Sequence, residues 1–227
     1  MYWPAVVTAA LAVLASVLAV LLWRALSRER KVRQVLAERT ADLLRASGRL
    51  ETATRQLDRL ASLDGLTGVA NRELFDEVFD REWRRLTRYS LPLTLLLVDI
   101  DQFGEFNQAN SHREGDECLR RVATHLAGAI NRPGDLVARY AADEFIVLLA
   151  GTDAAGAATM ADTLRDGVKG LGISRGAGQT EPVTVSLGVA TVVPWEGMVP
   201  AALFERAEWA LSRARKLGAN RTEIYAA

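Results

Sequence analysis

The chain has 227 residues, a single cysteine, and equal numbers of basic and acidic residues, 28 of each. This length suffices for one folded domain with accessory segments. The balanced charge gives no support to a nucleic-acid-binding surface, so we expect no nucleic-acid partner. Because Cys118 is alone, an intramolecular disulfide is excluded, which suits a reducing compartment.

The first predicted element is an uncharged apolar stretch at residues 4–23, PAVVTAALAVLASVLAVLLW. At ~1.5 Å per residue, a helix of this length reaches ~30 Å, the thickness of the hydrocarbon core of a bilayer. Tyr2, Trp3 and Trp23 lie near its ends, as is typical of interfacial aromatic residues. A cleaved signal peptide is the alternative, but it usually requires a basic region before the apolar run. We therefore expect a transmembrane helix within residues 1–26.

A basic cluster follows the apolar stretch and predicts its orientation. Its members are Arg24, Arg28, Arg30, Lys31 and Arg33, opposed only by a glutamate at position 29. Because positive charge is retained on the cytoplasmic side, we expect the N-terminus outside and the rest of the chain in the cytoplasm.

Residues 27–62 predict a helical signalling linker. They contain no proline, and Leu36, Leu43, Leu50 and Leu57 recur every seven residues, which favours a parallel coiled coil. The companion seam three residues further on is weaker: Arg39, Ala46, Ala53 and Leu60. An amphipathic helix that lies on the domain or on the membrane is the alternative.

From residue 63 onward, predicted strands alternate with predicted helices. The stretch LPLTLLLVDID at 91–101 is almost continuously apolar, which is typical of a strand buried on both faces. Residues 135–140 and 144–150 predict a hairpin. The other expected elements are helices at 115–130, 153–171 and 200–218 and strands at 182–192 and 222–225. This alternation predicts an α/β or α+β sheet with helices packed on it.

Acidic residues follow two of these strands. Asp99 and Asp101 end the buried strand, and Asp143 and Glu144 lie at the hairpin turn. If the strands are neighbours, the carboxylates converge at one edge of the sheet and repel one another unless a cation lies among them. Hard oxygen ligands favour Mg²⁺ or Mn²⁺. Acids at strand ends are also common as ordinary caps and turn formers.

Five motifs occur in a fixed order between residues 64 and 225. They are SLDGLTGVANR, VDIDQFGEFNQANSHREGDECL, RPGDLVARYAADEF, VSLGVA and AEWALSRARKLGANR. Together they resemble the GGDEF family of bacterial diguanylate cyclases. The resemblance implies a palm-like α/β domain over residues 63–227, in which a mixed or antiparallel central sheet is flanked by helices.

The resemblance also implies an activity and a location. Two domains would face each other, each holding GTP and Mg²⁺ or Mn²⁺, and would condense two GTP molecules into cyclic di-GMP and two pyrophosphates. A homodimer formed through the helical linker would bring the two domains together. With the predicted span at residues 4–23, the protein would be anchored in the bacterial inner membrane, with the GGDEF domain in the cytoplasm.

The metal-binding and catalytic residues of the family have counterparts at matching positions of this sequence. The resemblance implies that Asp99, the Ile100 carbonyl and Asp143 bind the metal. It implies that Asp143 and Glu144 are the catalytic acids, with Glu144 assisting metal binding or activation of the hydroxyl.

GTP contacts are implied in the same way. Asn107 and Asp116 would hold the guanine edge, and an acceptor carboxylate suits the N–H donors of guanine. Arg215 stands where the family usually has a phosphate-binding lysine. Phe103, Ala141 and Ala142 complete the implied GTP-binding residues.

The tetrapeptide RPGD, Arg132 to Asp135, matches the family's inhibitory cyclic di-GMP site. There the arginine would contact phosphate and the aspartate would accept hydrogen bonds from guanine. Pro-Gly at the centre of four residues is also a strong turn signal by itself. An alternative function follows, in which an inactive GGDEF-like domain binds cyclic di-GMP through this site or serves as a scaffold for another protein.

Three departures from the family pattern predict weak activity. Ala141 and Ala142 replace the usual glycines of the turn, where left-handed φ would cost each alanine roughly 1–2 kcal/mol and the methyl groups would crowd the nucleotide. Gly104 replaces a lysine and Ala219 replaces an arginine, so we expect a weakened grip on phosphate.

Overall fold

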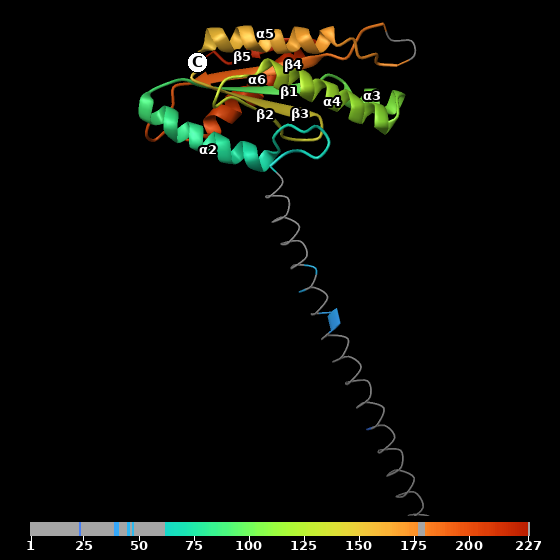
Figure 1. The fold of residues 1–227 in the computed structure, drawn as a ribbon, viewed down its shortest axis with the longest axis horizontal. Helices are drawn as coiled ribbons and strands as arrows, with labels where there is room; N and C mark the ends of the chain where they lie inside the picture. Colours follow the sequence, from blue (N-terminus) through green and yellow to red (C-terminus); the bar gives the residue numbers. More distant parts are fainter. Residues whose placement is uncertain are drawn as a thin grey trace, which may run out of the picture. The chain divides into compact units, whose positions relative to one another are not determined.

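The computed structural model describes residues 62–176 and 180–226, together with the isolated positions 23, 39, 40, 45 and 47. The chain divides into two units, Met1–Asp58 and Arg59–Ala227, and the elements named below belong to the second (Figure 1). Apart from residue 62 and the isolated positions, the predicted membrane span and the linker lie outside the described residues. Within the described part of the chain, no helix combines the length and the apolar character that a membrane span requires.

The second unit is built on a five-stranded mixed sheet in the order β2-β3-β1-β4-β5. Its strands are β1 (Leu93–Ile100), β2 (Leu136–Arg139), β3 (Glu144–Ala150), β4 (Val185–Val192) and β5 (Thr222–Ile224). All neighbouring pairs are antiparallel except β4 and β5, which are parallel. The prediction of a mixed sheet with helices packed on it is confirmed.

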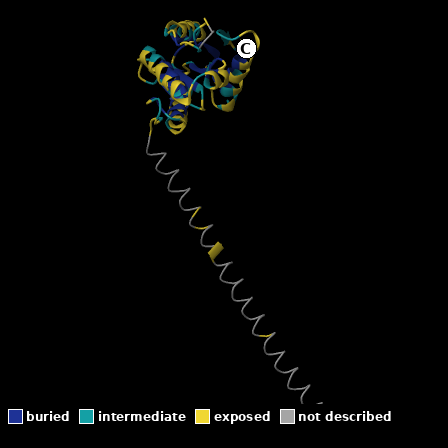
Figure 2. Cartoon of the chain, turned by 90° about the vertical axis from the view of Figure 1, so that its right-hand side faces the viewer, coloured by how far each residue is buried: buried dark blue, intermediate teal, exposed yellow. Residues whose placement is uncertain are grey.

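Helices cover both faces of the sheet (Figure 1). One face packs against α3 (Phe103–Ala109), α4 (His112–Ala129) and α5 (Ala154–Gly170). The other face packs against α2 (Arg72–Tyr89) and α6 (Ala201–Lys216). Buried residues accordingly line the inner sides of the helices and the sheet, and exposed residues lie on the outer sides (Figure 2).

The central strand β1 contributes to both hydrophobic cores. Leu95 and Leu97 point toward α2 and α6, whereas Leu96 and Val98 point toward α4 and α5. Successive side chains of a strand alternate between the two faces, so a strand that is covered on both sides is apolar at most positions. This explains the continuous apolar run in the sequence and confirms the predicted buried strand.

Helices α2 and α3 have no counterpart among the predicted elements, although α2 carries clear signals. The side chain of Asn71 caps α2 by accepting a hydrogen bond from the Leu74 amide at 2.9 Å. The apolar residues that follow recur at helical spacing and form an aromatic cluster, in which the rings of Phe75 and Phe79 lie 5.8 Å apart and Phe79 and Phe204 5.0 Å apart. Helix α2 is therefore fixed to the sheet by its buried face.

Helix α6 packs unusually close to β4 because of a glycine. A Cβ atom at Gly188 would collide with the backbone of Ala207 and Leu211 in α6. This small residue in VSLGVA therefore permits the close contact.

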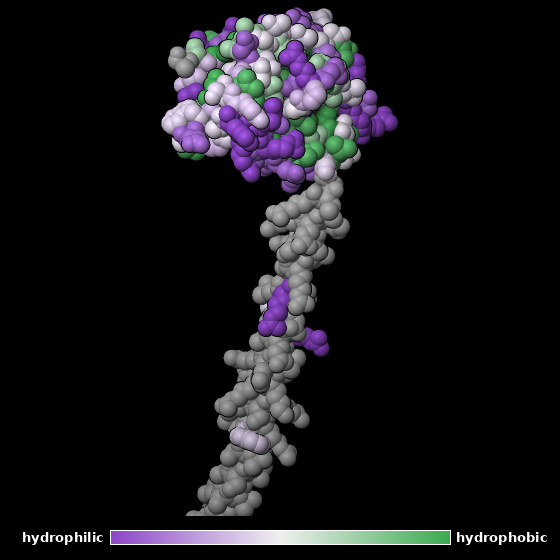
Figure 3. Space-filling view, turned by 60° about the vertical axis from the view of Figure 1, so that its left-hand side comes forward, coloured by the Kyte–Doolittle hydropathy of each residue, from purple (hydrophilic) through white to green (hydrophobic). Residues whose placement is uncertain are grey.

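The surface is mixed in character. The face in Figure 3 is mainly hydrophilic, with hydrophobic areas that are separated from one another. The largest exposed apolar side chains include Tyr89 and Leu91 before β1, and Val193 and Trp195 after β4. Because β1 and β4 are antiparallel, these residues lie at the end of the sheet opposite Asp99.

Candidate active site

Three acidic residues meet at the edge of the sheet where β1 ends. Strand β1 is antiparallel to both of its neighbours, so its last residues lie beside the first residues of β3 and β4. Asp99 is paired in register with Glu144, and the Ile100 amide donates a hydrogen bond to the Asp143 carbonyl at 3.4 Å. The structure thus brings together the acids that the sequence places in two distant motifs.

Arg215, in the last turn of α6, binds two of these acids. Its Nε donates to Oδ1 of Asp99 at 3.0 Å, and its Nη2 lies 2.5 Å from Oδ2 of the same carboxylate. Nη2 also donates to Oε1 of Glu144 at 3.0 Å. The Asp99 side chain is 14% exposed and that of Glu144 is 40% exposed, so Asp99 is the more deeply placed acid. Arg215 therefore supplies positive charge to an edge that would otherwise be strongly negative.

Burial raises the pKa of the Asp99 carboxyl to about 6, and the negative charges of Asp143 and Glu144 act in the same direction. The hydrogen bonds and charge of Arg215 oppose this rise only in part. For Arg215 itself, desolvation lowers the pKa, but the hydrogen bonds and charges of Asp99 and Glu144 outweigh it and raise the pKa overall. The ionised form of Asp99 is thus disfavoured even with Arg215 beside it.

The oxygen atoms at this edge suit a hard divalent cation. No group of three or more His, Cys, Asp or Glu side chains in the described part of the chain is arranged to hold a metal ion. Asp99 and Asp143 offer two carboxylates. The carbonyl of Ile100, the residue after Asp99, is a further oxygen. Mg²⁺ commonly binds one or two carboxylates and completes its shell with water and substrate phosphates. These residues therefore fit Mg²⁺ or Mn²⁺, on the condition that Arg215 moves off Asp99.

Asp101 has a structural role that separates it from Asp99. Its side chain is buried and accepts hydrogen bonds from the hydroxyls of Ser186 and Thr184 at 2.6 and 2.7 Å. It also accepts a hydrogen bond from the Asn220 amide at 2.9 Å. These contacts join the end of β1 to β4 and to the turn after α6. Asp101 therefore holds that turn beside the site.

The turn between β2 and β3 does not have the predicted strain. Ala141 and Ala142 are exposed, and neither is among the described non-glycine residues with positive φ. The amides of Tyr140 and Ala141 both donate to the Glu144 carbonyl, at 2.9 and 3.3 Å. The connection is longer than a two-residue hairpin loop, and such longer loops form without left-handed residues. The cost that a left-handed φ would impose on these alanines is therefore not paid.

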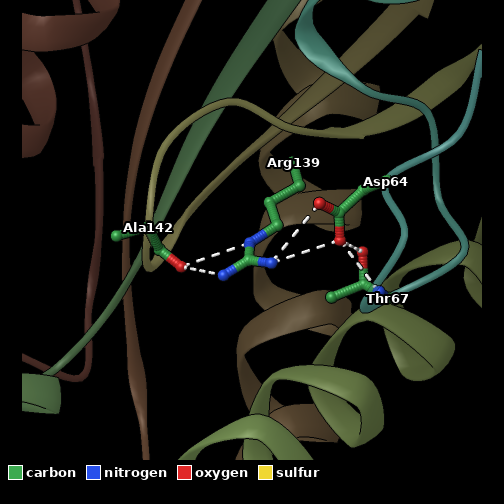
Figure 4. Close-up of polar contacts among 4 residues, drawn as sticks. All are labelled: Asp64, Thr67, Arg139 and Ala142. Atoms are coloured by element: carbon green, nitrogen blue, oxygen red, sulfur yellow. Dashed lines mark hydrogen bonds and ion pairs between the residues drawn. The ribbon is translucent and has the colours of Figure 1, made fainter. Parts of the chain in front are cut away.

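Arg139 fixes this turn to the start of the domain (Figure 4). Its Nη2 and Nε donate to the Ala142 carbonyl at 2.6 and 3.2 Å, and its Nη1 lies 3.2 Å from Oδ1 of Asp64. Asp64 in turn accepts hydrogen bonds from the amide and hydroxyl of Thr67, at 2.8 and 2.6 Å. The sequence gives no signal for these hydrogen bonds, because Asp64 and Arg139 are 75 residues apart and lie in different motifs. Together these residues fix the backbone just before Asp143.

The predicted guanine-binding residues lie where α3 and α4 meet. Asn107 belongs to α3 and Asp116 to α4. A Cβ atom at Gly115 would collide with the Asn107 side chain, so the glycine next to Asp116 makes room for that side chain. The Oδ1 atom of Asn107 is buried and accepts no hydrogen bond in the described structure. An unsatisfied buried acceptor fits a ligand that brings N–H donors.

Phe103, by contrast, is a core residue. Its side chain is 8% exposed and its ring stacks on Phe106 with centroids 5.9 Å apart. Any contact of Phe103 with a nucleotide would therefore involve its backbone.

A pocket of about 570 Å³ opens beside the acidic edge. Its lining includes Asp99 and Arg215 from the site, and Ala219 and Asn220 from the turn after α6. It also includes Arg175, which no sequence motif predicted. The pocket can hold a group the size of a triphosphate.

Arg132 and Asp135 lie in the turn between α4 and β2, apart from the acidic edge. The Asp135 amide donates to the Arg132 carbonyl at 3.1 Å, which closes the predicted turn. Oδ1 of Asp135 accepts a hydrogen bond from the Ala150 amide at 2.8 Å. Burial raises the pKa of Asp135, and nearby Glu82 adds to the rise, whereas Ala150 and Arg132 lower it. Asp135 thus ties its turn to the end of β3.

The fold and this edge define a class of protein. They combine a mixed sheet covered by helices with clustered acids, an arginine and a pocket of nucleotide size. Residues 61–221 match the family described as diguanylate cyclase, GGDEF domain. The chain belongs to this family.

Similarity to known proteins agrees with this assignment. The chain is 36% identical over 162 residues to the response regulator PleD of Caulobacter vibrioides and 32% identical over 167 residues to the diguanylate cyclase DosC of Escherichia coli. These matches cover 71% and 73% of this chain, but 35% of the length of each relative. The chain thus spans less than half the length of these curated relatives.

Solved structures show the same fold. The crystal structure of the coiled coil and GGDEF domain of DgcB from Caulobacter crescentus, in complex with c-di-GMP, superposes with a TM-score of 0.66 at 31% identity. The match covers 83% of this chain and 98% of that one.

Proposed function

We propose that this chain is a diguanylate cyclase, which condenses two GTP molecules into cyclic di-GMP and two pyrophosphates. The observation that carries the proposal is the meeting of Asp99, Asp143 and Glu144 at one edge of the sheet, beside Arg215 and a pocket of about 570 Å³. Membership of the GGDEF family supports it, as does similarity to a named diguanylate cyclase.

The proposed reaction is a phosphoryl transfer between two bound nucleotides. The 3′-oxygen of one GTP forms a bond to the α-phosphorus of the other, and the bond between that phosphorus and the leaving pyrophosphate breaks. A bound Mg²⁺ or Mn²⁺ supplies neutralisation of the charge that develops on the phosphate oxygens. Asp99 and Asp143 would hold this cation, and Glu144, which is 40% exposed, would accept the proton of the attacking hydroxyl. Arg215 exchanges its contact with Asp99 for a phosphate oxygen.

Recognition of the base falls to α3 and α4. The buried Oδ1 of Asn107 and the carboxylate of Asp116 accept hydrogen bonds from the N1 and N2 positions of guanine. Adenine lacks donors at both positions, so the site selects GTP over ATP.

A complete reaction needs a second copy of the chain, because each domain holds one GTP. The helical linker at residues 27–62 pairs two chains and so raises the effective concentration of the facing domains. The apolar stretch at residues 4–23 anchors the dimer in the bacterial inner membrane, with the domain in the cytoplasm. The reaction is weak, because Gly104 and Ala219 supply no charge to the phosphates and the methyl of Ala142 crowds the nucleotide.

A second function is supported by the turn at Arg132 and Asp135. The backbone hydrogen bond from Asp135 to Arg132 closes the turn, and a related domain was crystallised with c-di-GMP. In this alternative the domain binds cyclic di-GMP through these two residues and does not synthesise it.

One assay separates the two functions. The full chain, purified in detergent, is mixed with GTP and Mg²⁺ or Mn²⁺, and pyrophosphate and cyclic dinucleotide are measured. The cyclase predicts both products, with a rate that rises more steeply than the protein concentration. Absence of product at high protein concentration, with micromolar binding of cyclic di-GMP, supports the receptor. Glu117→Gln serves as a control, because Glu117 is an exposed acid on α4 outside the site.

A further inference from the structure

A second arginine shares the pocket with Arg215, and its surroundings differ. Arg175 follows α5 in a short loop that is closed by an isolated bridge between Ser174 and Pro182. Its guanidinium donates to the Pro182 carbonyl at 3.1 Å and to the Thr184 hydroxyl at 3.3 Å. It also contacts the Asp101 carbonyl and the Gln102 side-chain oxygen. Every one of these partners is a neutral oxygen.

The two arginines therefore differ in whether a carboxylate neutralises their charge. Arg215 is paired with the carboxylates of Asp99 and Glu144. Arg175 has no carboxylate within ion-pair distance in the described part of the chain. A half-buried guanidinium without an acid partner retains its attraction for an anion. Of the two cations, Arg175 is the one whose charge is not already neutralised.

The charges of the lining show why this cation matters. The pocket is lined by three acids, Asp99, Asp101 and Glu181, and by two arginines, which leaves a formal charge of −1. Without Arg175 the lining would carry −2. Ala219, on the wall of the same pocket, offers no side-chain donor. A polyphosphate is itself strongly anionic, so each positively charged side chain in the lining reduces the electrostatic repulsion between the pocket and the ligand.

We infer that Arg175 binds the terminal phosphates of GTP and so contributes a second phosphate contact beside Arg215. This inference rests on the proposed function, since it specifies how the same pocket holds its substrate. Gln102 keeps the guanidinium in place in the free chain and gives way to a phosphate oxygen, which is the stronger partner of an arginine.

Binding measurements with GTP and guanosine test the inference. The full chain in detergent is titrated with each ligand in the presence of Ca²⁺, which is used to limit turnover. Arg175→Ala should weaken GTP binding by about tenfold to a hundredfold, because a hydrogen bond between charged groups is lost, and should leave guanosine binding unchanged. Arg175→Lys should restore part of the affinity, because lysine keeps the positive charge but not the forked donors of arginine.

Arg121→Ala is the matched control. Arg121 also donates to a backbone carbonyl, that of Leu171 at 2.7 Å, near the start of the same loop, but it does not line the pocket. Its removal should leave both affinities unchanged. If Arg175→Ala binds GTP normally, or loses guanosine as strongly as GTP, the arginine only supports the loop and the inference is overturned.

The outcome also separates this inference from the proposed function. A chain that binds GTP but forms no cyclic di-GMP contradicts the cyclase, while the comparison of GTP with guanosine still decides the role of Arg175. A chain that forms cyclic di-GMP, with the same KM for GTP in Arg175→Ala, contradicts the inference alone. A chain that does not bind GTP contradicts both.

Discussion

The acidic edge at Asp99 and the turn at Asp135 each contain a half-buried acid near an arginine, and burial raises the pKa of both acids. Their partners differ. Asp135 accepts a hydrogen bond from the Ala150 amide, so the protein backbone uses its carboxylate. Asp99 lies beside two further acids, and in the described part of the chain its carboxylate is bound by one side chain, that of Arg215. The comparison shows that the acids at the edge exceed what the hydrogen bonds of the fold require. The acid of the turn, by contrast, stabilises the fold through a backbone hydrogen bond.

The largest expected effect is on the rate of the reaction, when one acid is removed from the edge at Asp99. Asp143→Ala should lower the rate of cyclic di-GMP formation by about a hundredfold to a thousandfold, because it removes a ligand that holds charge-neutralising metal. Pyrophosphate release from the full chain measures it, with Glu117→Gln as the control. A rate within a few-fold of the unsubstituted chain would show that the edge does not act in the reaction.

Arg139→Ala tests whether the position of the turn matters to the edge. It leaves Asp64 half-buried without its ion pair and frees the Ala142 carbonyl, so we expect the free energy of unfolding to fall by about 2 kcal/mol. We also expect the cyclase rate to fall, because Asp143 follows Ala142 directly. Arg132→Ala is the control, since Arg132 is exposed and its removal should change stability little. Equal melting temperatures for the two variants would argue against the role of Arg139.

The structural use of Asp135 predicts a smaller change. Asp135→Ala leaves the Ala150 amide without an acceptor and should lower the free energy of unfolding by about 1.5 kcal/mol. Asp135→Asn keeps an acceptor oxygen and should be close to neutral. Chemical denaturation of the three proteins measures both changes. A loss as large for asparagine as for alanine would mean that the negative charge, and not the hydrogen bond, holds the turn.

The raised pKa of Asp99 predicts the smallest change, with a definite sign. The pKa of the carboxyl is raised from its ordinary value of 3.8 to about 6 in the folded chain, so ionisation is harder in the folded state. Stability from this group is therefore present at low pH and is lost as the pH rises from about 4 to about 6. In a chelator at pH 7.5, Asp99→Asn should be more stable by on the order of 1 kcal/mol, after discounting for solvent screening. The difference should vanish below pH 4, and a less stable variant at pH 7.5 would contradict the assignment.

Much of the fold was predictable because it depends on local patterns. The apolar run of β1 and the helical spacing in α4 and α6 each fix an element within a short stretch of sequence. The meeting of Asp99 with Asp143 was also predictable, since acids at the end of one strand and the start of its neighbour share an edge when the strands are antiparallel. Helix α2 was missed despite its cap and its apolar spacing.

The contacts that could not be predicted join distant parts of the chain. Arg139 reaches Asp64 across 75 residues, and Arg175 reaches Gln102 across 73. No periodicity or motif encodes such pairs, because they depend on how the finished layers pack. The family's glycines do not reveal the conformation of Ala141 and Ala142 either: neither has positive φ, in a connection longer than a two-residue loop.

The central claim is that Asp99 and Asp143 share one divalent cation that holds a guanine nucleotide. Electron paramagnetic resonance of Mn²⁺ with the full chain, with and without GTP, measures it most directly. We predict one protein-bound Mn²⁺ per chain in the presence of GTP, lost in both Asp99→Asn and Asp143→Asn and retained in Asp135→Asn. Bound Mn²⁺ at the same level in either of the first two variants would contradict the claim.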